Sequence, residues 1–313
     1  MKTSAVILEK PGRAALSSIE LTEPAVGDLI VQVDWSGIST GTERLFWSGR
    51  MPDFPGMGYP LVPGYESVGR VIAAGPATSI PVGQYVFVPG ANCFGEIRAL
   101  FGGAAARLVV PEHRVAPIDE GLGASGVLLA LAATALHAIQ ARGAEPPELI
   151  VGHGVLGRLM ARLTVATGHA APVVWETNPA RHHGASGYPV VFPGDDPRRD
   201  YRSVYDVSGD ESLLDTLISR LGRGGEVVLA GFYSEPLSFI FPPAFMREAR
   251  IRIAAEWQPA DLAAVSRLVS EGTVSLHDLV THQEKAEVPN HAYRTAFTDS
   301  NCLKMILDWR GCA

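Results

Sequence analysis

The sequence is poor in cysteine, in charge and in uninterrupted apolar runs. Its 313 residues include three cysteines, Cys93, Cys302 and Cys312, and none of them forms a C-x-x-C pair. This count does not indicate a disulfide framework and fits a reducing cytoplasm. The formal net charge is −7 and no basic stretch occurs, so nucleic acid is not expected as a partner.

Segments that would direct the chain into or across a membrane are also missing. The apolar start of the chain reaches Pro11 too soon for a secretory signal. The most apolar run, residues 127–136, is too short to span a bilayer. We therefore expect a cytoplasmic protein without stable membrane insertion. Hydrophobic residues make up 47% and charged residues 19%, which predicts globular domains rather than disorder.

What the sequence does contain is a glycine-rich turn between an apolar strand and a helix. Residues 148–151 predict a buried parallel strand, and a G-x-G-x-x-G pattern follows directly. The first glycine permits the tight turn, the second admits a pyrophosphate, and the third lets the helix pack closely on the strand. The free N–H groups of the helix start add an anion site. The residues expected at the dinucleotide are Gly152, His153, Gly154, Val155, Leu156 and Gly157.

A second apolar strand, residues 172–176, ends in a carboxylate. Glu176 follows the last glycine by about 20 residues, the separation at which an acidic side chain binds the ribose hydroxyl. A carboxylate there repels a 2′-phosphate, so the pattern predicts NAD rather than NADP. Arg181, in the polar loop that follows, is a further candidate for the adenosine end. The alternative is a glycine turn without a ligand and a solvated Glu176.

The rest of the chain divides by its periodicity. From residue 5 to about 117, short strand-like runs are separated by glycine and proline, which predicts a β-barrel or sandwich. From residue 148 to about 254, strands alternate with helices, which predicts a parallel sheet covered on both faces. We thus predict an α/β fold in which a Rossmann-type, doubly wound domain (121–255) is inserted into a barrel domain made of residues 1–120 and 256–313. A helix around residues 261–270 would pack on the outside of the barrel domain.

This order of parts resembles the medium-chain dehydrogenase/reductase family. The resemblance rests on Pro-Gly-Tyr-Glu at 63–66, on the glycine turn, and on segments 206–209 and 224–232, and it covers nearly the whole chain. It implies that the barrel is a GroES-like catalytic domain. It also implies a homodimer, with contact through edge strands near residues 238–241. By the same analogy, three residues lie under the nicotinamide half of the cofactor: Ser208, Gly231 and Phe232.

The departures from the family concern zinc. Zinc-dependent members carry a cysteine ligand where this chain has Ser39, and a histidine where it has Tyr65. Neither a neutral hydroxyl nor a phenol replaces a thiolate and an imidazole as zinc ligands. The structural zinc lobe with its four cysteines is missing too. Only Glu66 agrees with the ligand motif, so no metal is expected.

Without zinc, a side chain must accept the proton of the alcohol, and four residues are candidates. His153 titrates near neutral pH and lies in the turn that faces the cofactor, although a histidine there can serve only as a phosphate donor. Tyr65 and Ser39 would accept the proton or orient the substrate, and Tyr65 as a base needs a neighbouring positive charge. Glu66 would relay the proton or satisfy a buried group.

An aromatic and methionine-rich segment, residues 46–59, is the candidate substrate wall. Flat apolar ligands suit such side chains, because aromatic rings offer stacking area and methionine adapts to irregular shapes. Arg44 and Arg50 flank the segment and would pair with a carboxylate. The alternative is that these rings cap the barrel or form a subunit contact. The candidates for substrate contact are Trp47, Arg50, Met51, Phe54 and Met57.

The resemblance implies an alcohol dehydrogenase that acts on a small molecule, and the residues at 39, 65 and 176 predict NAD as the cofactor and metal-free hydride transfer. Two alternatives stay open. One is a zinc-free quinone or enone reductase, which would normally use NADPH and against which Glu176 argues. The other is a dinucleotide-binding scaffold without turnover.

Overall fold

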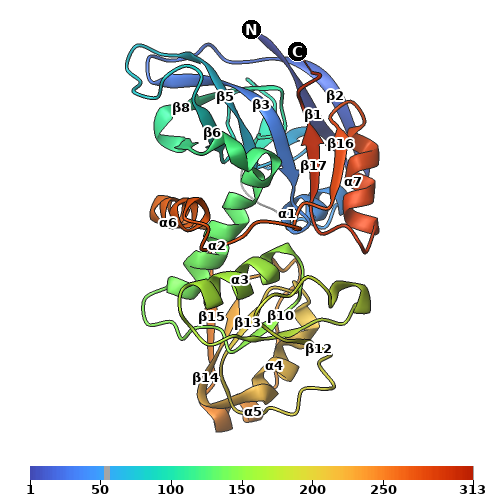
Figure 1. The fold of residues 1–313 in the computed structure, drawn as a ribbon. Coiled ribbons are helices and arrows are strands. Elements are labelled where there is room, and N and C mark those ends of the chain that lie inside the picture. Colours follow the sequence, from blue (N-terminus) through green and yellow to red (C-terminus); the bar gives the residue numbers. More distant parts are fainter. Residues whose placement is uncertain (53–56, 313) are drawn as a thin grey trace. The chain divides into compact units, whose positions relative to one another are not determined.

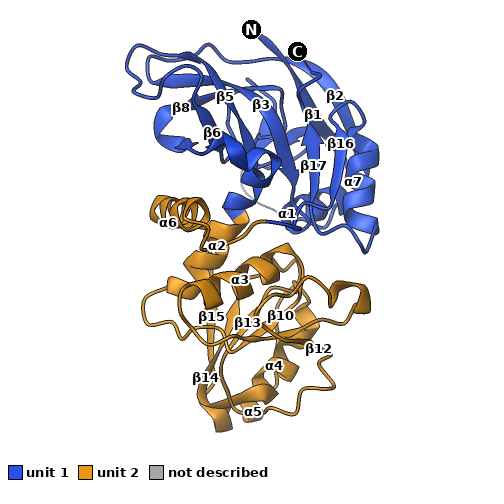
Figure 2. Ribbon diagram, viewed as in Figure 1, with its two compact units in different colours: residues 1–130, 277–313 blue, residues 131–276 orange. Residues whose placement is uncertain are grey.

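The computed structural model describes residues 1–52 and 57–312, which form two compact units (Figure 2). Unit 1 contains residues 1–130 and 277–313, and unit 2 contains residues 131–276. The predicted class is therefore confirmed: an α/β unit is inserted into a β unit made from both ends of the chain. The boundaries differ from those expected, because residues 121–130 belong to unit 1 and residues 256–276 to unit 2.

Unit 1 is built on two β-sheets (Figure 1). Its helices are α1 (Thr42–Ser48), η1 (Glu112–Arg114), η2 (Glu120–Leu128) and α7 (Pro289–Thr298). Its strands are β1 (Lys2–Lys10), β2 (Arg13–Glu20), β3 (Asp28–Ile38), β4 (Leu61–Pro63), β5 (Ser67–Ala74), β6 (Tyr85–Val88), β7 (Arg98–Leu100), β8 (Arg107–Pro111), β9 (Ala116–Pro117), β16 (His282–Lys285) and β17 (Met305–Asp308). The four-stranded sheet has the order β2-β1-β4-β7. The seven-stranded sheet has the order β16-β17-β3-β5-β6-β9, and β8 also pairs with β3.

The two ends of the chain meet in the larger sheet of unit 1. β17 pairs antiparallel with β3, so that Met305 lies opposite Ile38 and Asp308 opposite Trp35. Along β3, apolar side chains alternate into the core until residue 34, and the last four residues are all buried. A strand that is buried on both faces at its end delivers the following residue, Ser39, into the interior of the unit.

Unit 2 is a parallel sheet with helices. Its helices are α2 (Leu129–Gln140), which starts in unit 1, α3 (Val155–Ala166), η3 (Pro179–Arg181), η4 (Glu211–Leu213), α4 (Leu214–Arg220), α5 (Phe241–Arg247) and α6 (Pro259–Ser270). Its strands are β10 (Leu149–Val151), β11 (Val173–Trp175), β12 (Val190–Val191), β13 (Tyr201–Asp206), β14 (Leu221–Leu229) and β15 (Arg250–Ile253). The sheet order is β12-β11-β10-β13-β14-β15, and all its pairs are parallel. The order reverses between β10 and β13, where doubly wound sheets bind dinucleotides.

Two expectations about the end of unit 2 are corrected by the structure. Helix α6 belongs to unit 2 and not to the barrel, and His137 of α2 hydrogen-bonds Asp261 of α6 at 2.8 Å. Residues 238–240 form no strand, and the outer strand of the sheet is β15. Proline at the start of α5 and of α6 explains these helix positions, since proline is favoured in the first helical turn.

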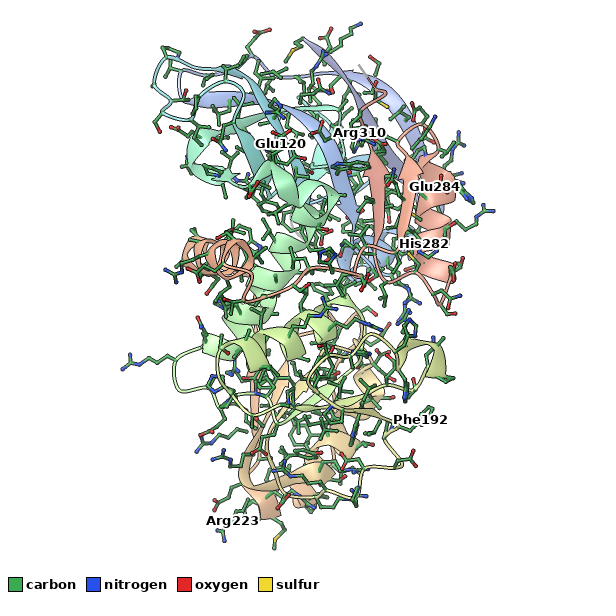
Figure 3. The ribbon with its side chains drawn as sticks, viewed as in Figure 1. Glu120, Phe192, Arg223, His282, Glu284 and Arg310 are labelled. Atoms are coloured by element: carbon green, nitrogen blue, oxygen red, sulfur yellow. The ribbon has the colours of Figure 1, made fainter. Side chains whose placement is uncertain are left out.

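Helices η2 and α2 follow each other directly and together form the segment Glu120–Gln140. This segment spans 21 residues and is apolar enough to cross a membrane by length and composition. The backbone of Gly123, with φ 47° and ψ −131°, interrupts its helical geometry. Most of α2 is buried inside the protein, including Leu129, Ala132 and Leu136. These are the properties of a core helix. The charged side chains of Glu120, Arg223 and Arg310 are exposed at the surface (Figure 3).

Candidate active site

The glycine turn after β10 has the backbone that the sequence pattern requires. Gly152 has φ 105°, which side chains other than hydrogen rarely allow. A Cβ atom on Gly157 would meet the carbonyl oxygen of Gly152, so α3 packs against the turn only because both residues are glycine. The N-cap of α3, Gly154, has no side chain to cap the helix. The first N–H groups of α3 therefore offer an anion site without a competing side chain.

Glu176 ends β11 beside this turn and is buried. Its Oε2 accepts the backbone N–H of His153 at 3.0 Å, and its Oε1 accepts that of Asn178 at 2.8 Å. Each carboxylate oxygen has a further lone pair for a hydroxyl group. The carboxylate is thus held against the turn by two backbone N–H groups.

The third part of the dinucleotide crevice lies at the ends of β13 and β14. A Cβ atom on Gly152 would lie 3.5 Å from the Cα of Ser208, so these two residues are neighbours. Asp206 accepts hydrogen bonds from the Ser208 hydroxyl at 2.6 Å and, through its other oxygen, from Tyr233 at 2.8 Å. Gly231 donates its N–H to the Asp206 carbonyl at 3.0 Å. These expected cofactor residues therefore lie close together at the carboxyl ends of neighbouring strands.

The structure argues against His153 as the proton acceptor. The ring is fully buried, and its Nδ1 donates to the carbonyl oxygen of Arg181 at 2.6 Å. The other nitrogen, Nε2, is then left to accept from the Tyr188 hydroxyl at 3.0 Å. Burial lowers the pKa of His153 to about 4, so the ring is neutral at pH 7. Both nitrogens are engaged, and the side chain ties the loop after Glu176 to the glycine turn.

Arg158 also supports this loop, although no pattern in the sequence indicates it as a site residue. This buried guanidinium donates to the carbonyl oxygens of His153 at 3.1 Å and Arg181 at 3.0 Å. Gly184 leaves room for the guanidinium, because a Cβ atom there would meet Arg158. Arg181 is therefore held through its carbonyl group, beside the end of β11. Phe232, in contrast, is exposed at the end of β14.

In unit 1, Ser39 and Tyr65 form a pair of hydroxyl groups. Ser39 Oγ lies 2.6 Å from the Tyr65 hydroxyl, and either group can donate. Ser39 is buried, Tyr65 is half-buried, and Thr42 also hydrogen-bonds the tyrosine. Burial, with the nearby charge of Glu66, raises the pKa of Tyr65 above its usual value. Tyr65 therefore stays a phenol, which favours the role of an orienting group over that of a base.

Glu66 forms a buried ion pair with Lys304, the residue before β17. The side chains are 0% and 1% exposed. Gly37 of β3 makes room for the pair, because a Cβ atom there would meet the Glu66 carboxylate and lie 2.9 Å from Lys304 Cε. Burial raises the pKa of Glu66, and the charge of Lys304 opposes this. Of the two expected roles, the contact fits the one in which Glu66 satisfies a buried group.

These residues do not fit a zinc ion. The Glu66 carboxylate faces an ammonium group, and the serine and tyrosine beside it are poor zinc ligands. In the part of the chain that the structure describes, no three His, Cys, Asp or Glu side chains gather closely enough to hold a metal.

Part of the expected substrate wall, residues 46–59, packs against other side chains of unit 1. Trp47 stacks on Tyr293 with ring centroids 5.7 Å apart, and Phe297 is 6.1 Å away. Met51 and Met57 pack against the core of unit 1. These contacts favour the alternative in which the rings cap the barrel. Arg50 is exposed, and Phe54 lies outside the described residues.

The fold and the site define a dehydrogenase with a GroES-like domain and a dinucleotide crevice. The model of the alcohol dehydrogenase GroES-like domain matches residues 25–120. The solved structure of 2R,3R-butanediol dehydrogenase from Bacillus subtilis has a TM-score of 0.83 at 20% identity and covers 98% of this chain and 99% of its own. Acetophenone reductase from Geotrichum candidum, in complex with NAD, also has a TM-score of 0.83 at 20% identity, over 98% and 97% of the two chains.

Full-length relatives narrow the class. The 2-desacetyl-2-hydroxyethyl bacteriochlorophyllide A dehydrogenase of Cereibacter sphaeroides is 58% identical over 100% of both chains. The enzyme of the same name from Rhodobacter capsulatus is 58% identical over 99% of both. The chain therefore belongs to the medium-chain dehydrogenase family, in the branch of these bacteriochlorophyllide dehydrogenases. Residues 36–71, 93–103 and 152–159 resemble that enzyme closely enough to predict this branch, and the full-length matches confirm it.

Proposed function

We propose that the protein oxidises the hydroxyethyl group on ring A of a bacteriochlorophyllide, a magnesium tetrapyrrole, to an acetyl group, with NAD as the hydride acceptor. The observation that carries the substrate is the 58% identity to two bacteriochlorophyllide dehydrogenases over the full chain. The reaction is a late step of bacteriochlorophyll a synthesis. It removes a hydride from the carbinol carbon and a proton from the oxygen.

The preference for NAD is supported by Glu176. Its carboxylate accepts the N–H group of His153 in the glycine turn, so it would be beside the adenosine ribose of a dinucleotide bound there. An NADP phosphate at this position would be repelled by the buried carboxylate of Glu176. The bound nucleotide supplies the hydride acceptor.

The residues that handle the proton belong to unit 1. We assign the substrate hydroxyl to the Ser39–Tyr65 pair, whose oxygens are 2.6 Å apart and can exchange a proton along their hydrogen bond. Tyr65 orients the alcohol and remains a phenol, because each hydroxyl of the pair passes on its own proton as it accepts one. The proton released by the alcohol then reaches solvent water by way of Thr42, which is half-buried and hydrogen-bonds Tyr65. The proposal involves no metal. Trp47, Arg50, Met51 and Met57 remain proposed substrate contacts, with Phe54.

An absorption assay tests this function. The purified chain is mixed with the hydroxyethyl pigment and either NAD or NADP, and the spectrum is followed as a new carbonyl joins the ring conjugation. We expect turnover with NAD and at least tenfold slower turnover with NADP. Reduction of enones with NADPH, and no oxidation, would support the reductase alternative. Binding of NAD without any turnover would support the scaffold.

We also propose a cytoplasmic homodimer. None of the three cysteines, which all lie in the described part of the chain, belongs to a disulfide, as expected in a reducing compartment. The outer strand β15 presents Ile251 and Ile253, which is 78% exposed, and helix α5 adds exposed Phe245 and Met246. An edge strand with apolar side chains pairs readily with a second copy of itself about a two-fold axis.

The dimer is tested by light scattering on a sizing column. We expect twice the chain mass of 33.3 kDa for the wild type, and the single mass for Ile253→Glu. Val82→Glu is the matched control, because Val82 is an exposed apolar residue of unit 1. A dimer that survives Ile253→Glu places the contact elsewhere.

A further inference from the structure

Glu43, which the sequence did not single out, holds the hydroxyl pair of unit 1 in place. It lies in the first turn of α1 and is 1% exposed. Its Oε1 accepts the backbone N–H of Ser39 at 3.1 Å, and its Oε2 accepts the hydroxyl of Tyr293 at 2.5 Å. One carboxylate therefore connects the end of β3 to helix α7, which lies near the other end of the chain.

The two hydrogen bonds of Glu43 connect the proposed hydroxyl pair with an aromatic stack. On one side, the fixed Ser39 backbone places Ser39 Oγ against the Tyr65 hydroxyl at 2.6 Å. On the other side, the fixed Tyr293 ring stacks on Trp47 at an interplanar angle of 29°. A change at Glu43 moves both the hydroxyl pair and the aromatic stack.

The neighbours of Glu43 act on its pKa in opposite directions. Burial raises its pKa to about 7, against the hydrogen bonds from Tyr293 and Ser39, which lower it. The carboxylate of Glu66 raises the pKa further, and the ammonium of Lys304 lowers it. The phenols of Tyr65 and Tyr293 also face this cluster, and burial raises the pKa of each, so both stay neutral. Glu43 therefore changes charge around pH 7.

We propose that Glu43 is a positioning residue for the alcohol oxidation, which as a carboxylate fixes the Ser39–Tyr65 hydroxyl pair for the substrate. The inference rests on the proposed role of that pair. An ionised carboxylate accepts from Ser39 and Tyr293 together, one donor on each oxygen. When Glu43 takes up a proton, one oxygen becomes a donor, and the Tyr293 hydroxyl must turn or move away. The pair then loses its fixed geometry, without any loss of the nucleotide crevice in unit 2.

The test uses the full-length enzyme with NAD and the hydroxyethyl pigment, with kcat and KM measured from pH 5.5 to 9. For the wild type we expect kcat to fall below about pH 7. Glu43→Gln keeps the shape of the side chain and cannot ionise. It should lower kcat about 10- to 100-fold, the cost of a misplaced reacting group, and change KM for the pigment less than threefold. The fall of kcat at low pH, called the acid limb here, should be absent.

Tyr293→Phe provides a second and milder variant, because it keeps the stacked ring and removes the hydroxyl. The lost hydrogen bond lowers the pKa of Glu43 in the wild type, so its removal should move the acid limb of kcat to higher pH. Glu43→Asp keeps the charge and should retain an acid limb at reduced kcat. A role in folding alone would not move the limb.

Two results would overturn the inference: a normal kcat with an unchanged acid limb in Glu43→Gln, or an unmoved limb in Tyr293→Phe. If Glu43→Gln does not fold, Tyr293→Phe alone decides. A failure of the proposed function can be distinguished from a failure of the Glu43 proposal, because the wild type would then not oxidise the pigment at all. Tyr65→Phe with unchanged kcat would remove the hydroxyl pair from the mechanism and leave the pigment reaction intact.

Discussion

At the scale of single residues, the structure separates groups that hold the site from groups that can react. His153 has both ring nitrogens bound, to Arg181 and Tyr188, and so it holds a loop. Ser39 and Tyr65 hydrogen-bond each other, and we propose them as the hydroxyl groups that bind a substrate alcohol. The residue types alone do not distinguish these roles, because a histidine in a cofactor turn suits either of them.

His153 gives a prediction about stability in acid. Its pKa is lowered from 6.5 to about 4 in the folded protein, so the unfolded chain binds a proton more readily. Stability is therefore lost as the pH falls from 6.5 to 4, by at most about 3 kcal/mol. His153→Gln should show a shallower loss over this range. Urea unfolding at pH 7, 5.5 and 4 measures it, and parallel curves for the two proteins would contradict the assignment.

At the level of secondary structure, the pairing of β17 with β3 assembles the part of unit 1 that contains Glu66 and Lys304. The pairing places Met305 opposite Ile38 and so brings Lys304 beside Glu66, which follows β4. A buried carboxylate without its partner is costly, because water no longer solvates the charge. The C-terminal strand therefore contributes more than a covering layer to the barrel.

Removal of the lysine tests this role of β17. Lys304→Met leaves the Glu66 charge unpaired and should lower the free energy of unfolding by about 3 to 5 kcal/mol. The double variant Glu66→Gln with Lys304→Met should recover most of that loss, since no unpaired charge remains. Denaturant midpoints measure both effects. A single variant as stable as the wild type would show that the pair contributes nothing.

At the scale of the whole molecule, the sequence predicted what lies in contiguous segments. The glycine turn and Glu176 are close along the chain, and their spacing follows from the geometry of a strand, a helix and a second strand. The class of fold, with one unit inserted in another, followed from the change in periodicity. The pairs Glu43–Tyr293 and Glu66–Lys304 join distant segments, so no local pattern could predict them.

The edge strand expected near residues 238–241 is wrong, because Ile240 precedes helix α5 and the outer strand is β15. Trp47, which we propose as a substrate contact, also stacks its ring on Tyr293 from α7. No local pattern predicts this stack, because Tyr293 lies in a remote part of the chain.

We propose that an alcohol is oxidised by a nicotinamide nucleotide with hydroxyl groups in place of a metal. The decisive experiment is the rate of pigment oxidation with NAD, by enzyme that has been treated with a strong chelator and checked for residual metal. We expect this rate to equal that of the untreated enzyme and to be lost in Tyr65→Phe. A rate that disappears on chelation and returns with added zinc would show that a metal takes part in the reaction.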